Sequence, residues 1–430
     1  MDRSTEHRAA AWETGSKPVS ALRVAILSYR SAPRVGGQGV YVDYLSRALS
    51  RAGAVVDVIS GPPYPELDPK VRLIKLPSLD LYAQPHDGNL ALRPRHLLSA
   101  TDTYEYFGHL SGKFVEPYTF GQRVFKYFKR NADKYDVILD NQTLATGTLA
   151  LQDKLNLPVM TMIHHPITQD RRLALESAPN WKHRLLVRRW YAFHHMQMRV
   201  ANQLRLITCP SEHAKKDIVS EFGVDPDRIH PIPLGVDQDA FCPMPNVRRL
   251  PGRLVTTASS DTPLKGLPVL LQAYHQLLQK NEKVDLVIIG KLREGPTEHL
   301  IKKLGLSDKV QFKSDLTRAE LAAEFNKASI AVTPSLYEGF GLPAAEAMSC
   351  GTPVIVTDGG ALPEVAGDAG IIVPKGDADA LATAISNLLN DREGYQQVAA
   401  ACLKRAQSRF NWQKIAPKYL DLFKQTAEIC

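Results

Sequence analysis

Residues 329–358 read SIAVTPSLYEGFGLPAAEAMSCGTPVIVTD and alternate between strand-like and helix-like patterns. An apolar run of strand length ends at Pro334, and a second such run closes the stretch. Between them a Gly-Phe-Gly loop at residues 339–341 leads into a helix whose first turn is expected to hold Pro343 and Glu346. A strand, a glycine loop, a helix and a further strand in this order predict one unit of a parallel α/β sheet.

The same alternation continues on both sides of this stretch. Short apolar runs recur, and stretches with an apolar period near 3.6 separate them, as parallel strands with helical crossovers require. The strand candidates are residues 22–28, 55–60, 135–140, 158–164, 204–211, 254–259, 284–290, 310–314, 329–335, 352–358 and 370–374, and the helix candidates are 40–49, 118–131, 181–202, 268–279, 318–327 and 378–389.

A proline-rich stretch divides the chain. Residues 231–251 hold five prolines and no sustained periodicity, and 430 residues are too many for one ordinary core. The predicted fold class is therefore α/β, with two Rossmann-like doubly wound domains that face each other across a cleft. The expected parts are an irregular tail at 1–21, an amino-terminal domain at 22–237, a linker at 238–251, a carboxyl-terminal domain at 252–405 and a terminal helix at 406–430 that returns to the first domain.

The composition excludes several classes of protein. With 44% apolar and 23% charged residues the chain is neither disordered nor fibrous. The five cysteines are far apart, which argues against a zinc site, and no apolar run approaches the roughly 18 to 20 residues that span a bilayer. The start of the chain lacks the apolar core of a signal peptide, so a cytoplasmic location is expected. Of the net charge of +8, +7 belongs to residues 1–237.

The segment between Glu338 and Glu346 has the chemistry of a diphosphate site. Glycines let a ligand approach the backbone closely, and the first N–H groups of a helix lack internal partners and favour an anion. A carboxylate accepts two hydrogen bonds at once, so each glutamate suits a vicinal diol of a hexose or a ribose.

The pattern E-G-F-G-L-P-x-x-E-A-M-x-x-G-x-P-V-I stands at residues 338–355, and it resembles the motif of glycosyltransferase family 4, whose members are retaining enzymes with the GT-B fold. The resemblance implies that Glu338 binds hydroxyls of the transferred sugar and that Glu346 binds the ribose of the nucleotide. It also implies that the backbone around Gly339, Phe340, Gly341 and Leu342 holds the diphosphate, within a carboxyl-terminal domain that binds the nucleotide sugar.

Other segments are similar to the same family. The resemblance places three glycines of an amino-terminal loop beside the donor phosphate, a histidine against the reacting sugar, a lysine on the diphosphate and a glycine in the pocket for the base. These residues are Gly36, Gly37, Gly39, His164, Lys265 and Gly290, and His164, Glu338 and Lys265 are the expected catalytic residues. At one expected diphosphate-binding position the chain departs from the family pattern, because Ser260 stands where an Arg is usual; Arg30 or Arg34 is the candidate substitute.

The resemblance implies transfer of a hexosyl unit from a nucleoside-diphosphate sugar, with UDP as the first expectation and GDP or ADP as alternatives. No cofactor and no metal are expected, because the Asp-x-Asp pairs, such as Asp237 and Asp239, lie at turns or helix starts where Asp is ordinary. The acceptor, a small molecule, a lipid or a glycan, is expected to meet the amino-terminal domain, with specificity in the loops of residues 61–120. Residues 61–95 are interrupted by seven prolines and are read as loops.

Two rival functions remain at this point. The first is another GT-B reaction, such as sugar-nucleotide epimerisation or phosphorolysis. The second is a basic module that binds an anionic membrane surface at the inner face of the membrane, suggested by the basic and aromatic residues 181–199. Nucleic acid is excluded as a partner because neither an RNA-binding motif nor a P-loop occurs.

Overall fold

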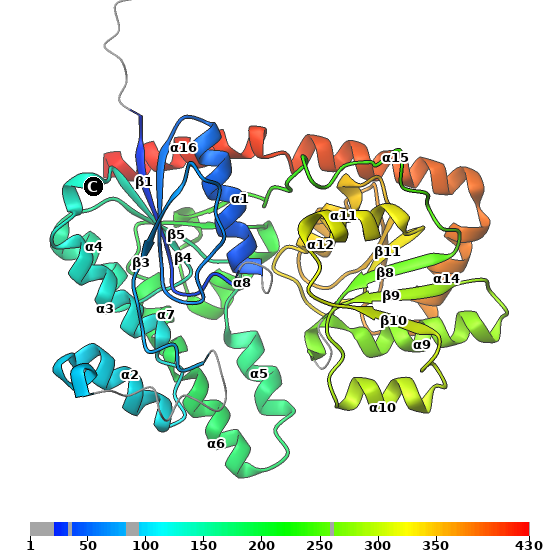
Figure 1. Cartoon of the computed structure of the whole chain (residues 1–430), viewed down its shortest axis with the longest axis horizontal. Helices are drawn as coiled ribbons and strands as arrows, with labels where there is room; N and C mark the ends of the chain where they lie inside the picture. The colour runs from blue at the N-terminus through cyan, green and yellow to red at the C-terminus, as the bar shows by residue number, and fades with distance from the viewer. Residues whose placement is uncertain (1–20, 33–36, 83–93, 259–261, 430) are drawn as a thin grey trace, which may run out of the picture.

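The computed structural model describes residues 21–32, 37–82, 94–258 and 262–429. Two parallel sheets, each flanked by helices, lie side by side (Figure 1). The amino-terminal sheet has the strand order β3-β2-β1-β4-β5-β6-β7, and the carboxyl-terminal sheet has the order β10-β9-β8-β11-β12-β13. The predicted fold class of two doubly wound α/β domains is confirmed.

The amino-terminal part contains strands β1 (Arg23–Ser28), β2 (Val55–Ser60), β3 (Arg72–Lys75), β4 (Val137–Asn141), β5 (Val159–Met162), β6 (Leu206–Cys209) and β7 (Ile229–Pro231). Its α-helices are α1 (Gly37–Arg51), α2 (Ala100–Leu110), α3 (Glu116–Phe128), α4 (Thr146–Leu155), α5 (Thr168–Glu176), α6 (Trp181–Trp190), α7 (His194–Ala201) and α8 (Glu212–Phe222). Short 3₁₀ helices are η2 (Pro94–Leu98), η3 (Ala132–Lys134), η4 (Tyr191–Phe193) and η5 (Pro226–Arg228).

The carboxyl-terminal part contains strands β8 (Arg253–Thr257), β9 (Asp285–Ile289), β10 (Val310–Lys313), β11 (Ile330–Thr333), β12 (Val354–Thr357) and β13 (Ile371–Val373). Its helices are η6 (Pro263–Lys265), α9 (Leu267–Gln279), α10 (Pro296–Lys303), α11 (Arg318–Lys327), α12 (Leu342–Ser349), α13 (Leu362–Ala366), α14 (Ala378–Asn390), α15 (Arg392–Arg409) and α16 (Trp412–Ile429).

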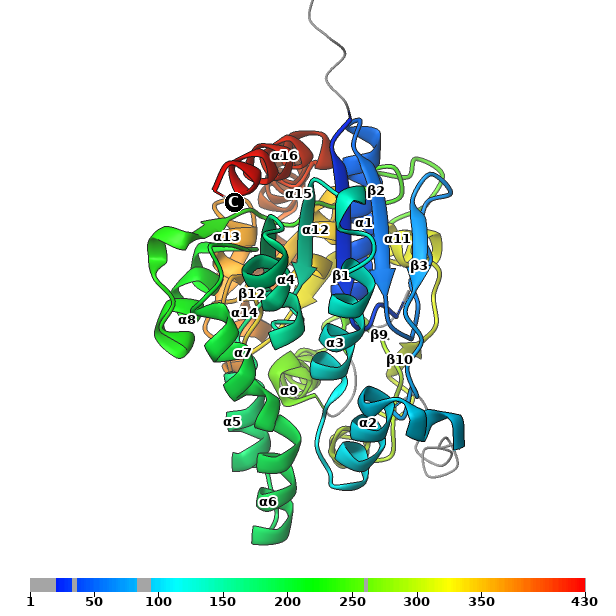
Figure 2. The ribbon, with the colours of Figure 1, turned by 90° about the vertical axis from the view of Figure 1, so that its left-hand side faces the viewer.

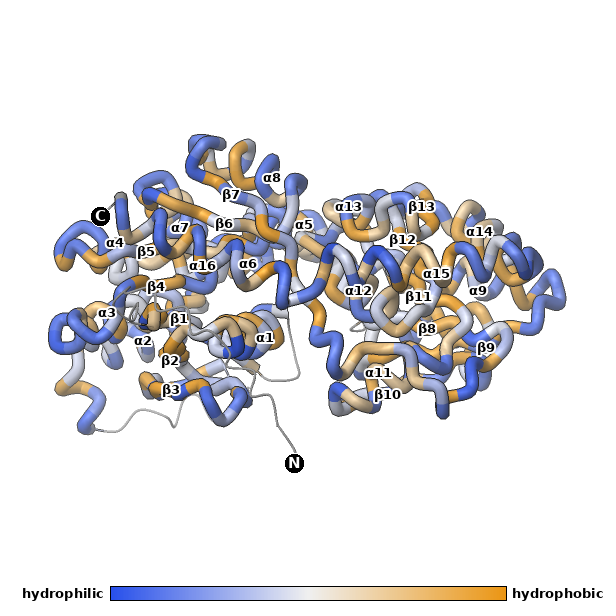
Figure 3. Tube along the Cα trace, turned by 90° about the horizontal axis from the view of Figure 1, so that it is seen from above, coloured by the Kyte–Doolittle hydropathy of each residue, from blue (hydrophilic) through white to orange (hydrophobic). Residues whose placement is uncertain are grey.

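Strand β1 shows why the strands are continuously apolar. Val24 and Ile26 point into a core that includes α1, whereas Ala25 and Leu27 point into a second core that includes α3. Because helices cover both faces of a parallel sheet, neither face of the strand can be polar. In Figure 3 the outer helices alternate instead between hydrophilic and hydrophobic colours, as amphipathic helices do.

Helix α16 joins the two parts of the molecule. It follows α15 of the carboxyl-terminal part and packs against α1 of the amino-terminal part (Figure 1). Tyr419 accepts a hydrogen bond from the hydroxyl of Tyr41 at 3.1 Å, and both rings are fully buried. One core cluster contains residues of both sheets, of α1 and of α16.

Three elements differ from the expectations. The stretch read as loops contains β3, an edge strand in parallel register with β2, and β7, which pairs with β6 within the predicted amino-terminal domain, was not among the strand candidates. The helix expected at 181–202 is two helices, α6 and α7, separated by η4, and the carbonyl of Trp190 at the break accepts a hydrogen bond from the amide of Phe114. Within the described residues no helix is long and apolar enough to cross a bilayer.

Candidate active site

Lys265 and Glu338 form an ion pair after the carboxyl ends of neighbouring strands. Lys265 ends η6, which follows β8, and Glu338 follows β11. The lysine Nζ lies 2.7 Å from Oε1 of the glutamate, which also accepts a 2.8 Å hydrogen bond from Ser335 Oγ. Gly266 makes the approach practicable, because it has a φ of +62° and a Cβ there would collide with the carbonyl of Pro334. Two expected site residues, 73 positions apart, thus meet at one edge of the sheet.

The Gly-Phe-Gly loop lies against the amino-terminal part. A Cβ on Gly339 would come within 2.6 Å of the carbonyl oxygen of His164, and the Gly339 carbonyl accepts a 3.0 Å hydrogen bond from Ser211 Oγ. Ser211 also caps α8 by accepting a hydrogen bond from Ala214 N at 2.9 Å. Close contact between the two chain segments is therefore sufficient to require glycine at position 339.

The loop ends at Gly341, which has a φ of +99° and precedes the first residue of α12. The Phe340 ring is buried edge-on to Phe410 and belongs to the core, so the ring itself does not face a ligand. Among the described residues none accepts a hydrogen bond from the amides of Phe340, Gly341 or Leu342, whereas Ala344 N is bonded to Gly341 O at 3.0 Å.

Glu346 lies one turn later than expected. Because α12 begins at Leu342, Glu346 is in the second turn of the helix, and the expectation of a first-turn glutamate is wrong. The carboxyl group is buried and faces α1, where the Tyr44 hydroxyl donates to Oε1 at 3.4 Å. Burial raises the pKa of Glu346 to about 8. The carboxyl group is accordingly protonated over most of the neutral range.

His164 follows β5, and its ring turns back into the amino-terminal part. Its Nε2 lies 2.8 Å from Asn141 Oδ1, and its ring meets that of Tyr41 edge-on with centroids 4.9 Å apart. Burial lowers the pKa of His164 to about 3, so the imidazole is neutral at working pH. The backbone carbonyl of His164, rather than its ring, is the group in contact with the glycine loop.

The remaining glycines differ in their surroundings. A Cβ on Gly37 would meet open space, whereas one on Gly39 would collide with the carbonyl of Ala32, so chain packing alone explains Gly39. Gly290 directly follows β9 and donates its amide to Lys313 O at 2.8 Å. Gly36, Arg34 and Ser260 lie outside the described residues.

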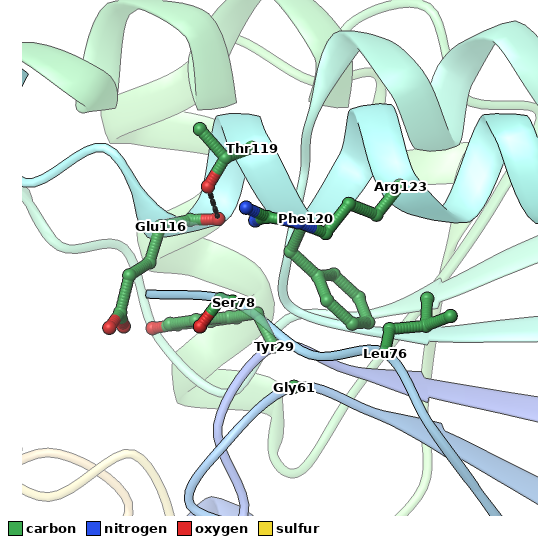
Figure 4. Close-up of a pocket in the computed structure, with 8 residues that line it drawn as sticks. All are labelled: Tyr29, Gly61, Leu76, Ser78, Glu116, Thr119, Phe120 and Arg123. Carbon is green, nitrogen blue, oxygen red and sulfur yellow. Dashed lines mark hydrogen bonds between the residues drawn. The ribbon is translucent and has the colours of Figure 1, made fainter. Parts of the chain in front are cut away.

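Arg30, the other candidate substitute for the usual Arg, is engaged within the amino-terminal part. Its Nη1 lies 2.9 Å from Oε2 of the buried Glu116. Burial raises the pKa of Glu116 to about 7, against the opposing effect of Arg30. Glu116 lines a small cavity beyond the ends of β1, β2 and β3 (Figure 4), together with Tyr29, Gly61, Leu76, Ser78, Thr119, Phe120 and Arg123.

A second cluster of charges connects the two parts of the molecule. Arg318 of α11 binds Asp43 of α1 and approaches Asp237 with 2.9 Å between Nη1 and Oδ2. Arg47 of α1 bonds the same two carboxylates at 3.0 and 2.8 Å, and the Arg318 guanidinium lies 4.8 Å from the ring centroid of Tyr44. No local sequence pattern around Asp237 indicates that its carboxylate pairs with an arginine of the carboxyl-terminal part.

A further contact of this kind involves Glu364 of α13. Its carboxylate accepts from the amides of Glu212 and His213, at 2.9 and 2.6 Å, at the amino terminus of α8. A carboxylate is favourable there because the first amides of a helix are unpaired. Sequence reasoning missed this contact, since the two segments are more than 150 residues apart.

Comparison with known proteins agrees with this architecture. The family model described as Glycosyltransferase Family 4 matches residues 35–240, and the one described as Glycosyl transferases group 1 matches residues 246–405. The solved sucrose-phosphate synthase of Thermosynechococcus elongatus superposes with a TM-score of 0.71 at 24% identity, over 95% of this chain and 100% of that chain. Fold and site together define a glycosyltransferase with the GT-B fold.

Two relatives are similar along almost their whole length. The MMP alpha-(1->4)-mannosyltransferase of Mycolicibacterium hassiacum is 42% identical over 94% of this chain and 98% of its own. A D-inositol 3-phosphate glycosyltransferase of Xylanimonas cellulosilytica is 30% identical over 94% of this chain and 97% of its own. The chain belongs to glycosyltransferase family 4.

Proposed function

We propose that this glycosyltransferase moves a hexosyl unit, with mannose as the first candidate, from a nucleoside-diphosphate sugar to an acceptor hydroxyl. The observation that carries the proposal is the Lys265–Glu338 pair beside the amides that open α12. The relative that transfers mannose with α-(1→4) linkage supports the choice of sugar. A nucleotide sugar has an α-linked diphosphate in its common form, so an α product corresponds to retention of configuration.

The leaving diphosphate gains negative charge in the transition state. Lys265 has three N–H donors, so it can keep its bond to Glu338 and still donate to a phosphate oxygen. The amides of Phe340, Gly341 and Leu342 add donors with no partner among the described residues. Fixed donors of this kind stabilise developing charge without reorganisation during the reaction.

The two glutamates suit different hydroxyl groups. Both protein donors to Glu338 reach Oε1, which leaves Oε2 for the hydroxyls of the transferred sugar. Glu346 has a pKa raised to about 8 and is protonated at neutral pH, so it can donate one hydrogen bond and accept others from the ribose. His164 is neutral and contributes its carbonyl edge next to Gly339.

The proposed transfer needs no cofactor, because one glycosidic bond forms as the bond to the diphosphate breaks. The bond between the anomeric carbon and the diphosphate oxygen breaks, and the diphosphate leaves with the electron pair. The acceptor oxygen bonds the anomeric carbon from the same face, and its proton passes to the departing phosphate oxygen. In this scheme residues 252–405 bind the donor, residues 22–237 bind the acceptor, residues 238–251 link them, and residues 406–430 fasten the two together.

Acceptor specificity is assigned to the amino-terminal part. The cavity of Figure 4 opens beyond the carboxyl ends of its strands, where ligands of parallel sheets bind. Polar groups from residues 61–120, including Ser78, Glu116 and Thr119, line it. The cavity has room for about one water molecule, so it can take at most a single hydroxyl of an acceptor.

The test is to incubate the purified protein with UDP-, GDP- and ADP-mannose and the matching glucose donors, each with and without short α-mannosides. We expect a new mannoside with one donor, and the one-bond carbon–proton coupling at its anomeric carbon reports the configuration. Free sugar without a new mannoside would indicate hydrolysis, and an epimer of the donor would indicate epimerisation. A sugar phosphate formed only with added phosphate would indicate phosphorolysis. Each of these results would overturn the proposed transfer. A β-linked product would overturn retention.

A further inference from the structure

Exposed apolar side chains are concentrated at one end of the amino-terminal part. Of the twelve large apolar side chains that are exposed among the described residues, nine lie on η2, α2 and α6. We refer to these nine as the α2–α6 surface. They are Leu97, Leu98, Tyr104, Phe107, Leu110, Trp181, Leu185, Leu186 and Trp190.

The two halves of this surface are neighbours. Arg189 of α6 donates through Nε to the carbonyl of Ser111, directly after α2, at 2.7 Å. Trp190 stacks on Phe114 with ring centroids 5.2 Å apart. Figures 1 and 2 both show α2 and α6 beyond the same end of the amino-terminal sheet, with α6 projecting furthest. The nine exposed apolar side chains therefore lie on neighbouring elements at one end of the amino-terminal part, where the carboxyl ends of α2 and α6 meet.

Helix α6 presents both apolar and cationic side chains to the solvent. Trp190 packs on Phe114, so this side of α6 faces the domain. Residues three, four and seven positions apart share a side of a helix, which places Trp181, Leu185 and Arg188 together on the side away from Trp190. Trp181 is 70% exposed and Leu185 is 47% exposed.

The charge of this region has one sign. Residues 177–211 contain no Asp or Glu, whereas α6 alone carries Lys182, Arg184, Arg188 and Arg189. The acidic residues of α2 turn inward, where Asp102 and the fully buried Glu105 both bind Arg123. The exposed part of the α2–α6 surface is thus apolar and cationic.

We propose that the α2–α6 surface docks on an anionic lipid bilayer, with α6 lying along the headgroup region. Exposed Trp and Leu between arginines suit an interface in which the rings enter the acyl boundary and the guanidinium groups meet lipid phosphates. A second copy of the chain fits less well, because it would oppose two cationic faces. This inference does not depend on which sugar or acceptor the enzyme uses.

Vesicle flotation of the full chain tests the proposal. We expect the protein to float with phosphatidylcholine vesicles that contain phosphatidylglycerol, to float much less with phosphatidylcholine alone, and to be released by high salt. Arg184→Gln with Arg188→Gln should weaken partitioning about 20-fold, and Trp181→Ala with Leu185→Ala should also weaken it. Circular dichroism and transfer to a water-soluble acceptor should be unchanged in both variants.

A matched control removes two charges from the other end of the molecule. Lys414 and Lys418 are exposed on α16, and Lys414→Gln with Lys418→Gln should leave flotation unaltered. Equal binding to neutral and anionic vesicles, or equal flotation of the α6 and α16 variants, would overturn the proposal. So would light scattering that shows a dimer in the wild type and a monomer in the α6 variants, because the surface would then be occupied by a second copy.

Discussion

Lys265 and Glu338 are oppositely charged residues that satisfy each other before any donor binds. Their side chains are 34% and 14% exposed, so water screens the pair only in part. The pairing holds each charged group where the proposed donor needs it and limits the desolvation that binding requires. The same geometry makes the two residues energetically dependent on each other.

Lys265→Ala and Glu338→Gln are each expected to lower kcat/KM by about 10²–10³-fold, because each removes a group aimed at charge or hydroxyls in the transition state. The double variant should lose less than the product of the single losses, since each single change leaves its partner unpaired. Steady-state kinetics with the nucleotide sugar that the donor screen identifies measures kcat/KM of the single and double variants. Lys302→Ala breaks an exposed pair with Glu298 of the same 2.7 Å length and should change kcat/KM less than twofold. Full activity of Lys265→Ala would show that Lys265 does not take part in the proposed transfer.

Glu346 should make the free energy of unfolding decrease as the pH rises. Burial raises its pKa from an ordinary value of 4.5 to about 8, so the folded chain holds this proton more tightly than the unfolded chain. Its stabilising contribution is complete below pH 4.5 and is lost as the pH rises towards 8. Glu346→Gln cannot ionise, so its Tm relative to wild type should rise between pH 5 and 8.5.

Thermal melts across this pH range provide the measurement. Glu393→Gln, on the exposed start of α15, is the matched control and should give a constant difference from wild type. A Glu346→Gln difference that is also constant with pH would show that the carboxyl group is ionised throughout.

At the scale of elements, the glycine loop depends on the segment it contacts. Gly339 is held between the His164 carbonyl and Ser211, both supplied by the other part of the molecule. The motif predicted a glycine for ligand approach, and the structure adds a second reason for it. Sequence patterns revealed the loop but could not reveal these contacts. Gly339 is 175 positions from His164 and 128 positions from Ser211 along the chain.

Gly339→Ala is expected to lower the free energy of unfolding by about 1–3 kcal/mol, because its Cβ would come within 2.6 Å of a backbone oxygen that cannot simply rotate away. Gly37→Ala is the comparison, since nothing lies within 4 Å of its Cβ, and it should be neutral or stabilising by up to about 1 kcal/mol within α1. Urea denaturation separates the two. Equal stability of both variants would mean that the loop relaxes freely.

The missed strands show what local pattern leaves out. β3 is four residues long, partly exposed and preceded by prolines, and β7 ends on Pro231. Both are edge strands, where a short length and a proline without an N–H are tolerated because one side of the strand is unpaired. The central strands were predicted correctly because burial on both faces forces a continuous apolar run.

At the scale of the whole molecule, Arg318 of α11 is one charged link between the carboxyl-terminal and amino-terminal parts. It meets Asp43 and Asp237, which Arg47 also binds, and it covers Tyr44. A planar guanidinium suits two carboxylates and an aromatic face at once. Tyr44 in turn donates to Glu346, so this cluster connects the relative placement of the domains to a proposed donor residue.

Arg318→Ala should loosen this placement. We expect a larger radius of gyration by small-angle X-ray scattering and a kcat/KM about tenfold or more lower, because misplacement of reacting groups by about 1 Å can cost up to about 100-fold. Arg253→Ala breaks an ion pair with Asp285, 2.7 Å long, within the carboxyl-terminal part and should leave the radius of gyration unchanged. An Arg318→Ala protein with the wild-type radius and activity would show that α16 and the shared core suffice to hold the domains.

The sequence by itself determined the fold class and the central strands, because apolar periodicity is a local property of a chain, and its resemblance to a family indicated Glu338, Glu346 and Lys265 as candidate site residues. The tertiary structure decided which of these residues meet: the lysine with one glutamate, Tyr44 with the other, and Gly339 with the His164 carbonyl. It also decided that Glu346 is buried, which raises the pKa of its carboxyl group, and that Arg318 joins the domains. Burial and long-range pairing arise only when distant segments pack, so no local pattern encodes them.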